Sequence, residues 1–356
     1  MTPTPIVIGA GGTAGHVVPA LAVADALRAE EAQVVFLGGE RAETELVPAA
    51  GYRFEPLVVR PLARGGAGVT ETVRVAATDA AALARAIALL GELRPAAALG
   101  AGGYVAGPTG LAAVLRRAPL VLMEADSHLG LTNRLLAPFA RRVCLAFPIK
   151  GRAGSRYRVY GRPVPAPATD REAARARFGM ARDERCVLVF GGSQGARSIN
   201  RAALEAFRGA QFRVLHAVGE RNLAELEAPG RHYDLRGYIP NFGEALLASD
   251  LVVARAGGSV FEVAAHGRPA VLVPYPHATG DHQMLNARFM ADAGAAVVIP
   301  DSELTPARLA DEVGRLLAEP TRAAAMANAA LAAARPRAAQ EIAAEVLAAA
   351  RQGRPR

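Results

Sequence analysis

Short apolar runs rich in β-branched residues alternate with longer alanine-rich stretches along most of this chain. In the first half the apolar runs fall at residues 6–8, 34–37, 54–59, 96–99, 120–123 and 143–145. Strands that alternate with helical stretches of this length are typical of βαβ units. The pattern therefore predicts an α/β fold with a parallel sheet in the first half of the chain.

A proline-rich segment at residues 160–167, Tyr-Gly-Arg-Pro-Val-Pro-Ala-Pro, interrupts this alternation. Proline continues neither a helix nor a central strand, so we expect a linker here. The apolar runs resume afterwards at 187–190, 212–218, 251–253, 270–273 and 296–299. A chain of 356 residues also exceeds what one hydrophobic core usually supports. We predict one domain at 1–162 and another at 163–335, with a C-terminal helix, 336–356, joining the first.

The composition, 51% hydrophobic and 21% charged residues, indicates a globular protein. No apolar run has the roughly 18 residues of a membrane span, and Met1 to Pro5 lack signal-peptide features, so we expect a cytoplasmic protein. Cys144 and Cys186 each lie alone in an apolar run and are expected to be buried.

The net charge is +8, and the basic excess lies mainly in residues 1–162, which hold 18 Lys/Arg and 12 Asp/Glu. Such a surface attracts phosphorylated substrates, anionic lipid or nucleic acid. Dense basic runs and abundant aromatic residues are lacking, so we predict no nucleic-acid partner. Lys150 is the only lysine, which excludes a P-loop of the Gly-x-x-x-x-Gly-Lys type.

Both predicted domains open with a strand followed by a glycine loop. The first is Gly11-Gly12-Thr13-Ala14-Gly15 and the second is Gly191-Gly192-Ser193-Gln194-Gly195. Backbone N–H groups of such loops approach phosphate oxygens closely, and the helix dipole behind them favours negative charge. Ligands of parallel sheets bind beyond the carboxyl ends of the strands. Two diphosphate-binding loops facing one interdomain cleft are therefore predicted.

His16 directly follows the first loop, where the positive end of the helix dipole favours a neutral imidazole. That suits a general base for an attacking hydroxyl. A competing interpretation is a dinucleotide-binding dehydrogenase, because residues 9–14 also fit Gly-x-Gly-x-x-Ala and Glu40 follows the second strand. The second glycine loop and His16 have no role in that alternative.

Two more double-glycine turns, 102–108 and 255–262, follow predicted strands, and Glu262 is suited to bind ribose hydroxyls. A polar cluster at 279–286 offers amide and imidazole groups for sugar hydroxyls. It contains Asp281 and His282, but no further ligands stand at a recognised metal spacing. We predict no bound metal and no cofactor.

Together these segments resemble the MurG family of bacterial glycosyltransferases over nearly the whole chain. The motifs that carry the resemblance are Gly11 to Leu21, Gly102 to Pro108, Gly130-Leu131-Thr132-Asn133, Gly191 to Arg197, and His282-Gln283 with Asn286. The resemblance implies a GT-B fold, in which two Rossmann-like domains face each other across a cleft. It also implies inverting transfer of GlcNAc from UDP-GlcNAc to the 4-hydroxyl of MurNAc in lipid I, giving lipid II for peptidoglycan, at the cytoplasmic face of the plasma membrane.

The resemblance further implies the roles of individual residues. His16 is the expected catalytic base, with Asp126 as an alternative. The donor residues are Thr13, Ala14, Gly15, Asp126, Gly192, Ser193, Gln194, Ile239, Arg255, Gly258, Ser259, Glu262, His282 and Gln283. The acceptor residues are Gly11, Gly12, Gly102, Gly103, Tyr104 and Asn133. Arg60 to Arg74 is a candidate membrane-docking segment.

Several positions depart from the family pattern, among them Ala14, Ala125, Asp126 and Pro165, and the segment from Arg255 to Glu262 is one residue shorter. At the linker, Gly161-Arg162-Pro163-Val164-Pro165 replaces Gly-Asn-Pro-Val-Arg. Other GT-B transferases, a sugar-nucleotide epimerase and a non-catalytic binding protein remain alternatives.

Overall fold

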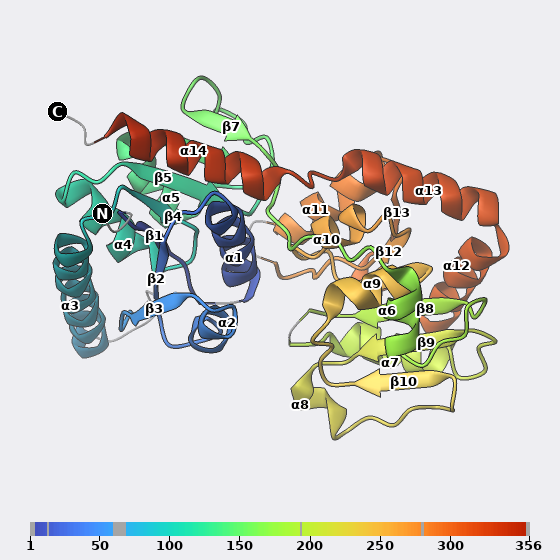
Figure 1. Cartoon of the computed structure of the whole chain (residues 1–356). Coiled ribbons are helices and arrows are strands. Elements are labelled where there is room, and N and C mark those ends of the chain that lie inside the picture. The colour runs from blue at the N-terminus through green and yellow to red at the C-terminus, as the bar shows by residue number, and fades with distance from the viewer. Residues whose placement is uncertain (1–3, 13, 60–68, 193, 279–280, 354–356) are drawn as a thin grey trace. The chain divides into compact units, whose positions relative to one another are not determined.

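The computed structural model describes residues 4–12, 14–59, 69–192, 194–278 and 281–353. The chain forms two compact units, of which unit 1 is Met1–Pro165 with Arg335–Arg356 and unit 2 is Ala166–Ala334. The sequence pattern places this boundary three residues earlier, at 162/163. Each unit is a parallel α/β domain (Figure 1).

Unit 1 contains a parallel sheet of seven strands in the order β3-β2-β1-β4-β5-β6-β7. The strands are β1 Ile6–Gly9, β2 Val34–Gly38, β3 Arg53–Pro56, β4 Ala97–Gly100, β5 Leu120–Glu124, β6 Arg142–Leu145 and β7 Tyr157–Val159. The helices are α1 Ala14–Ala29, α2 Glu43–Ala49, α3 Val69–Leu93, α4 Ala106–Leu115, α5 Leu131–Leu136, the short η1 Ala137–Phe139, and α14 Ala338–Gln352.

The central strands of unit 1 are buried on both faces, which explains their uninterrupted apolar sequences. One face packs against α1 and α14, where Val17 and Leu27 meet Ile342 and Val346. The opposite face packs against α3 and α4, through residues such as Leu89. The C-terminal helix thus completes the core of unit 1 (Figure 1).

Unit 2 contains six parallel strands in the order β10-β9-β8-β11-β12-β13. The strands are β8 Cys186–Phe190, β9 Arg213–Ala217, β10 Tyr233–Arg236, β11 Leu251–Ala254, β12 Ala270–Leu272 and β13 Ala296–Val298. The helices are α6 Arg171–Arg177, α7 Arg197–Ala206, α8 Glu220–Leu223, α9 Phe242–Ala248, α10 Val260–Ala265, α11 His282–Asp292, η3 Asp301–Glu303, α12 Pro306–Ala318 and α13 Pro320–Ala333. The core on one face joins α7 to α12 through Phe207 and Val313.

Both sheets share the strand order of the Rossmann fold, with the order reversing between β1 and β4 in unit 1 and between β8 and β11 in unit 2. Each glycine loop leaves the sheet at this reversal. The apolar pattern does not predict β7 and β10. Both lie towards a sheet edge and carry polar residues, because an edge strand is not enclosed by neighbours on both sides.

Cys144 and Cys186 are both free and buried, as predicted. Burial raises the pKa of the Cys186 thiol to about 12, so it stays protonated at neutral pH. Among the helices that the structure describes, none has the length and apolar character needed to cross a membrane.

Candidate active site

The first glycine loop, at Gly11-Gly12, and the double-glycine turn at Gly102-Gly103 pack directly against each other at the carboxyl edge of the unit 1 sheet. A Cβ on Gly103 would lie 2.2 Å from the carbonyl oxygen of Gly11, and one on Gly102 would lie 2.7 Å from Cδ2 of His16. Both glycines also have positive φ, +75° and +90°. Glycine is therefore required here for contact between the loops, whether or not a ligand is bound.

Glu43, in the first turn of α2, lies fully buried beneath the first glycine loop. Its Oε2 accepts the N–H of Gly12 at 3.0 Å, and its Oε1 has no hydrogen-bond partner among the described residues. The Gly12 amide is therefore occupied by a protein carboxylate and cannot also bind a phosphate. Sequence reasoning missed Glu43, because its only signal is a carboxylate shortly after the second strand.

His16 lies half-buried in the first turn of α1. Burial is the main cause of its lowered pKa; Arg162 lowers it further, whereas the negative charges of Asp126 and Glu43 raise it. The ring is therefore neutral at pH 7 and able to accept a proton. The helix dipole argument predicts the same protonation state, but the structure supplies a stronger cause, desolvation.

The loop that follows β5 carries Asp126 and is held by the buried carboxylate of Glu124. Glu124 Oε2 accepts the Gly130 N–H at 2.9 Å and the Asn133 Nδ2 at 3.0 Å, and its Oε1 accepts the Asp126 N–H at 3.2 Å. Asn133 Nδ2 also donates to the carbonyl of Met123 at 2.9 Å. With only 2% of its surface exposed, Asn133 lies behind this loop, not on its surface.

Tyr104 borders the first glycine loop, because a Cβ on Gly12 would lie 3.0 Å from its ring. The Arg41 guanidinium lies 5.7 Å from the centre of the same ring. Burial raises the pKa of the Tyr104 hydroxyl, so it remains a neutral hydrogen-bond donor. Thr13 lies outside the described residues, as does the side chain of Ala14.

The second glycine loop has one packed side and one open side. A Cβ on Gly195 would lie 1.8 Å from the carbonyl oxygen of Val218, whereas Gly192 has nothing within 4 Å. Gln194 is exposed beside Gly192, and α7 begins just after the loop, at Arg197. This open side near a helix N-terminus can receive an anionic group. Ser193 lies outside the described residues.

A buried polar chain supports the second loop from beneath. Asn200 Nδ2 donates to the Val218 carbonyl at 2.9 Å, and its Oδ1 lies 3.2 Å from His216 Nε2. His216 Nδ1 lies 2.7 Å from the Tyr233 hydroxyl. Burial lowers the pKa of His216 to about 3, so it is neutral. It donates through Nε2, since the Asn200 oxygen can only accept. Sequence reasoning missed this chain, whose members lie far apart in the sequence.

Arg255, expected to contact the donor, is buried in a network of protein acceptors. Its Nη1 donates to the carbonyls of Val273 and Pro274, at 3.1 and 3.2 Å, and to Asp301 at 2.5 Å. Its Nη2 donates to Ser198 Oγ at 2.8 Å, and Ser198 in turn donates to Asp301 at 2.7 Å. The guanidinium thus ties the ends of β11 and β12 to α7.

The remaining predicted donor residues lie in unit 2, mainly on loops and helix starts. Glu262 lies half-buried in the first turn of α10, which Gly258 and Ser259 precede. His282 begins α11, and Gln283 Oε1 accepts the Tyr275 N–H at 2.9 Å. Ile239 is buried between β10 and α9.

Within the described part of the chain, no three His, Cys, Asp or Glu side chains form a metal-binding group.

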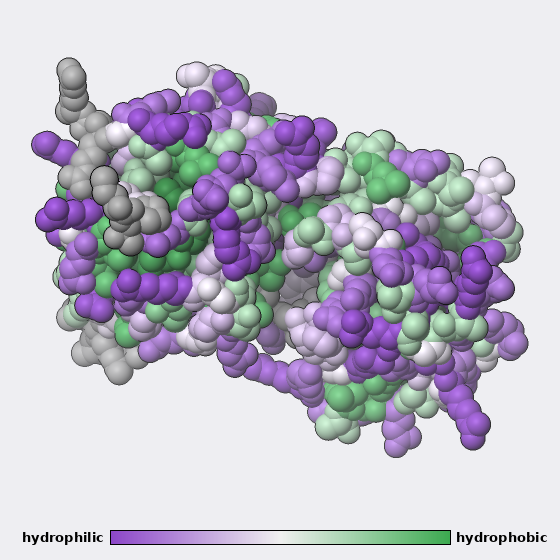
Figure 2. Space-filling model, viewed as in Figure 1, coloured by the Kyte–Doolittle hydropathy of each residue, from purple (hydrophilic) through white to green (hydrophobic). Residues whose placement is uncertain are grey.

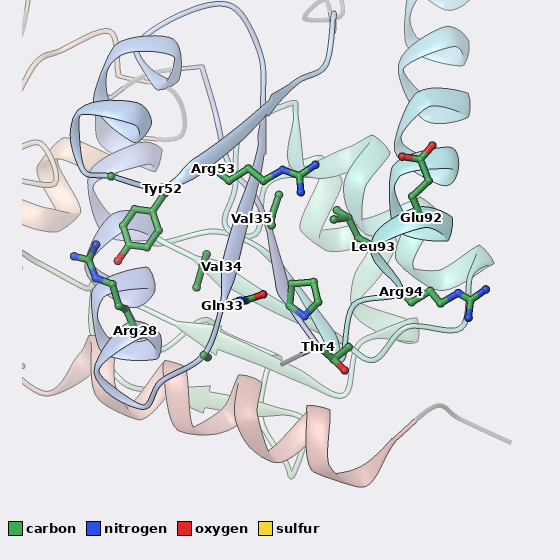
Figure 3. Close-up of a pocket in the computed structure, with 13 residues that line it drawn as sticks. Thr4, Arg28, Gln33, Val34, Val35, Tyr52, Arg53, Glu92, Leu93 and Arg94 are labelled. Carbon is green, nitrogen blue, oxygen red and sulfur yellow. The ribbon is translucent and has the colours of Figure 1, made fainter. Parts of the chain in front are cut away.

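A hollow of about 800 Å³ in unit 1 lies at the opposite, amino-terminal edge of the sheet (Figure 3). Arg28 and Tyr52 lie side by side at one end of it, with the guanidinium 4.5 Å from the ring centre, and Glu92 to Arg94 form the other end. None of the predicted site residues lines it. We therefore do not assign the active site to this hollow, despite its size.

Family models match both halves of the chain. The glycosyltransferase family 28 N-terminal domain matches residues 6–145, and the family 28 C-terminal domain matches residues 186–342. Two relatives are named UDP-N-acetylglucosamine--N-acetylmuramyl-(pentapeptide) pyrophosphoryl-undecaprenol N-acetylglucosamine transferase. That from Sorangium cellulosum is 41% identical, covering 99% of this chain and 90% of its own. That from Alkalilimnicola ehrlichii is 42% identical, covering 95% and 97%.

Solved structures agree with these matches. Acinetobacter baumannii MurG is 30% identical, with a TM-score of 0.74 over 97% of this chain and 100% of its own. A putative UDP-N-acetylglucosamine 2-epimerase from Listeria monocytogenes has a TM-score of 0.71 but 15% identity, so it shows the fold alone.

Two Rossmann-type domains with matching glycine loops form the GT-B fold, and the family 28 matches make the chain a glycosyltransferase of that fold. Within that class the chain belongs to the MurG family, the family 28 transferases to which these relatives belong.

Proposed function

We propose that this chain transfers GlcNAc from UDP-GlcNAc to the 4-hydroxyl of MurNAc in lipid I, undecaprenyl-diphospho-MurNAc-pentapeptide, and so forms lipid II for peptidoglycan. The observation that carries the proposal is 41% identity over 99% of the chain to a relative with that named activity. The site geometry adds a neutral imidazole at the start of α1.

In the proposed reaction His16 removes the proton from the 4-hydroxyl as its oxygen attacks the anomeric carbon of the donor. The new C–O bond forms as the bond to UDP breaks, and UDP departs with the electron pair, so the anomeric configuration inverts. Asp126, whose charge favours protonated His16, would stabilise the imidazolium that results. Asp126 itself is the alternative base.

Unit 2 would bind UDP-GlcNAc. The open side of the second glycine loop lies at Gly192, shortly before the N-terminus of α7, which would stabilise negative charge on the departing diphosphate. Glu262 would accept the ribose hydroxyls, the Ile239 backbone would bind uracil, and His282 with Gln283 would contact the sugar. Ser259, at the start of α10, would also contact the donor, and Arg255 would hold this surface in place.

Unit 1 would bind lipid I near His16, between the turn at Gly102 to Tyr104 and the loop of Asp126. Asn133 would act here by holding that loop, since it is itself buried. Gly15 and the described backbone of Ala14 lie at the start of α1 and are the residues of unit 1 that we propose for donor binding. Gly11 and Gly12 would shape the acceptor pocket, with the Gly12 amide already bonded to Glu43.

Unit 1 would also dock on the cytoplasmic face of the plasma membrane, where lipid I resides. Large apolar side chains are exposed on α4, α5 and η1, namely Leu111, Leu115, Leu131, Leu135 and Phe139. We call these five residues the apolar patch. Exposed arginines directly after α4, Arg116 and Arg117, and on α5, Arg134, suit an anionic leaflet. Figure 2 shows hydrophobic surface bordered by hydrophilic side chains around the position of α4. Arg60 to Arg74 lacks described side chains and adds nothing to this argument.

The decisive test is transfer of radiolabelled GlcNAc from UDP-GlcNAc to a detergent-solubilised lipid I analogue by the full chain. We expect a lipid-linked disaccharide with a β1,4 bond. Folded protein that transfers no label would contradict the proposal. Conversion of UDP-GlcNAc without acceptor would instead indicate an epimerase, and a nicotinamide-dependent absorbance change would indicate a dehydrogenase.

A further inference from the structure

Arg162 stands in the linker that leaves unit 1, yet its side chain points into the unit and is only 7% exposed. A guanidinium is costly to bury unless acceptors surround it. Arg162 Nη1 donates to the carbonyl of Ala125 at 3.0 Å, and its Nη2 donates to the carbonyl of Gly15. Both acceptors are backbone atoms of loops at the candidate active site.

These two carbonyls belong to the residues that immediately precede the proposed reacting groups. Gly15 precedes His16 in the first turn of α1, and Ala125 precedes Asp126 after β5. The two segments are about 110 residues apart in sequence. A single planar group that donates to both fixes their spacing, because a guanidinium offers its donors in a rigid fork.

The charge of Arg162 also acts on His16. Among the described residues, charged groups that influence the ring are Asp126 from the β5 loop, Arg162 from the linker and Glu43 from α2. The neutral Tyr104 comes from the turn after β4. Arg162 is the only cation among these, and it lowers the pKa of His16 against the two carboxylates. Removing it would leave two negative charges that favour the protonated ring.

We propose that Arg162 is a positioning residue for the transfer reaction, which fastens the His16 segment to the Asp126 loop and places a positive charge beside the base. The inference rests on the proposed function for the role of His16, but the relationship between Arg162 and His16 can be measured without any substrate. Arg162 thereby connects the linker to the segment that carries the proposed catalytic base, His16.

The first experiment measures the titration of His16 in the full chain by NMR of ¹⁵N-labelled histidine, with His16→Ala identifying the signal. In Arg162→Met we expect the His16 pKa to rise, and in Arg162→Lys, which keeps the charge, to stay close to wild type. Arg158→Met removes an exposed arginine of β7 and is the matched control. An unchanged titration in folded Arg162→Met would overturn the inference.

The second experiment measures kcat against pH in the lipid I assay. Arg162→Met should shift the acidic limb to higher pH and lower the maximal kcat by about 10²-fold, because the two segments lose their common anchor. Arg162→Lys should lower kcat less and leave the limb in place. Unchanged kcat and an unmoved limb in Arg162→Met would contradict the inference.

If Arg162→Met fails to fold, Arg162→Gln replaces it, because glutamine retains an amide donor without the charge. The same shift of the His16 titration is expected, and its absence counts against the inference. Failure of the wild-type chain to transfer GlcNAc would refute the proposed function alone, since the NMR titration decides the relationship between Arg162 and His16 independently.

Discussion

The N–H of Gly12 donates to the buried carboxylate of Glu43 at 3.0 Å, directly beneath the first glycine loop. A loop that resembles a phosphate cradle in sequence is thus held by a protein anion in the structure. The carboxylate removes one of the donors that such a loop would offer to a phosphate.

Glu43→Ala should destabilise unit 1 by about 1–3 kcal/mol, because it leaves the Gly12 N–H buried without an acceptor. Glu43→Gln, which keeps an acceptor oxygen, should cost less. Amide hydrogen exchange reports both effects, since protection of the Gly12 amide should fall in the alanine variant and persist in the glutamine variant. Equal protection in wild type and Glu43→Ala would contradict this account of the loop.

His16→Ala should lower kcat by about 10²-fold or more and leave UDP affinity unchanged, because the base acts on the acceptor hydroxyl. In the wild type, burial lowers the His16 pKa below its ordinary 6.5, so the base is deprotonated at neutral pH and kcat should fall only at more acidic pH. A pH–rate profile with radiolabelled donor tests this. His232→Ala, outside the candidate site, serves as the control. Near-normal turnover in His16→Ala would transfer the role to Asp126.

Unit 2 should lose stability in acid because His216 is buried in its neutral form. Its folded pKa is about 3 against an ordinary 6.5, so between these values the unfolded chain binds the extra proton. Stability is fully present above 6.5 and falls by about 1.4 kcal/mol per pH unit as the pH drops towards 3. Exchange of β9 amides should show a shallower dependence in His216→Gln. An identical dependence would show that His216 does not titrate on unfolding.

Arg255→Met should destabilise unit 2 by about 3–5 kcal/mol, because the Asp301 carboxylate loses its cation in a mostly buried network. Affinity for UDP should fall as a consequence, since Ser198 and the ends of β11 and β12 are no longer tied together. Urea unfolding and calorimetry with UDP separate the two effects. Lost affinity at unchanged stability would show instead that Arg255 contacts the ligand directly.

The apolar patch should anchor the protein to anionic vesicles. Leu135→Glu with Phe139→Glu should abolish co-sedimentation with phosphatidylglycerol vesicles, because these side chains are 63% and 64% exposed and would have to enter the interface as anions. Leu331→Glu, an equivalent change on α13 of unit 2, is the control. Transfer to a short-chain, water-soluble acceptor should persist in the double variant. Undiminished sedimentation would place the docking surface elsewhere.

The sequence by itself determined the class of the fold and the location of its loops. Buried parallel strands must be apolar throughout, so the central strands were predictable, and a glycine loop after the first strand of each half marks the switch point. The edge strands β7 and β10 escaped prediction, because their partly exposed positions carry polar residues that resemble loops.

Only the tertiary structure decided how individual polar residues are used. A motif states which residue type stands at a position, but not whether its donors face a ligand or the protein. Asn133 belongs to a family motif and Arg255 to a double-glycine turn, yet their side chains are bonded to protein acceptors. Glu43 and Arg162 belong to no glycine motif, yet they hold the loops beside His16. Such pairings join residues distant in sequence, and they form only because folding brings buried polar groups together and each must find a partner.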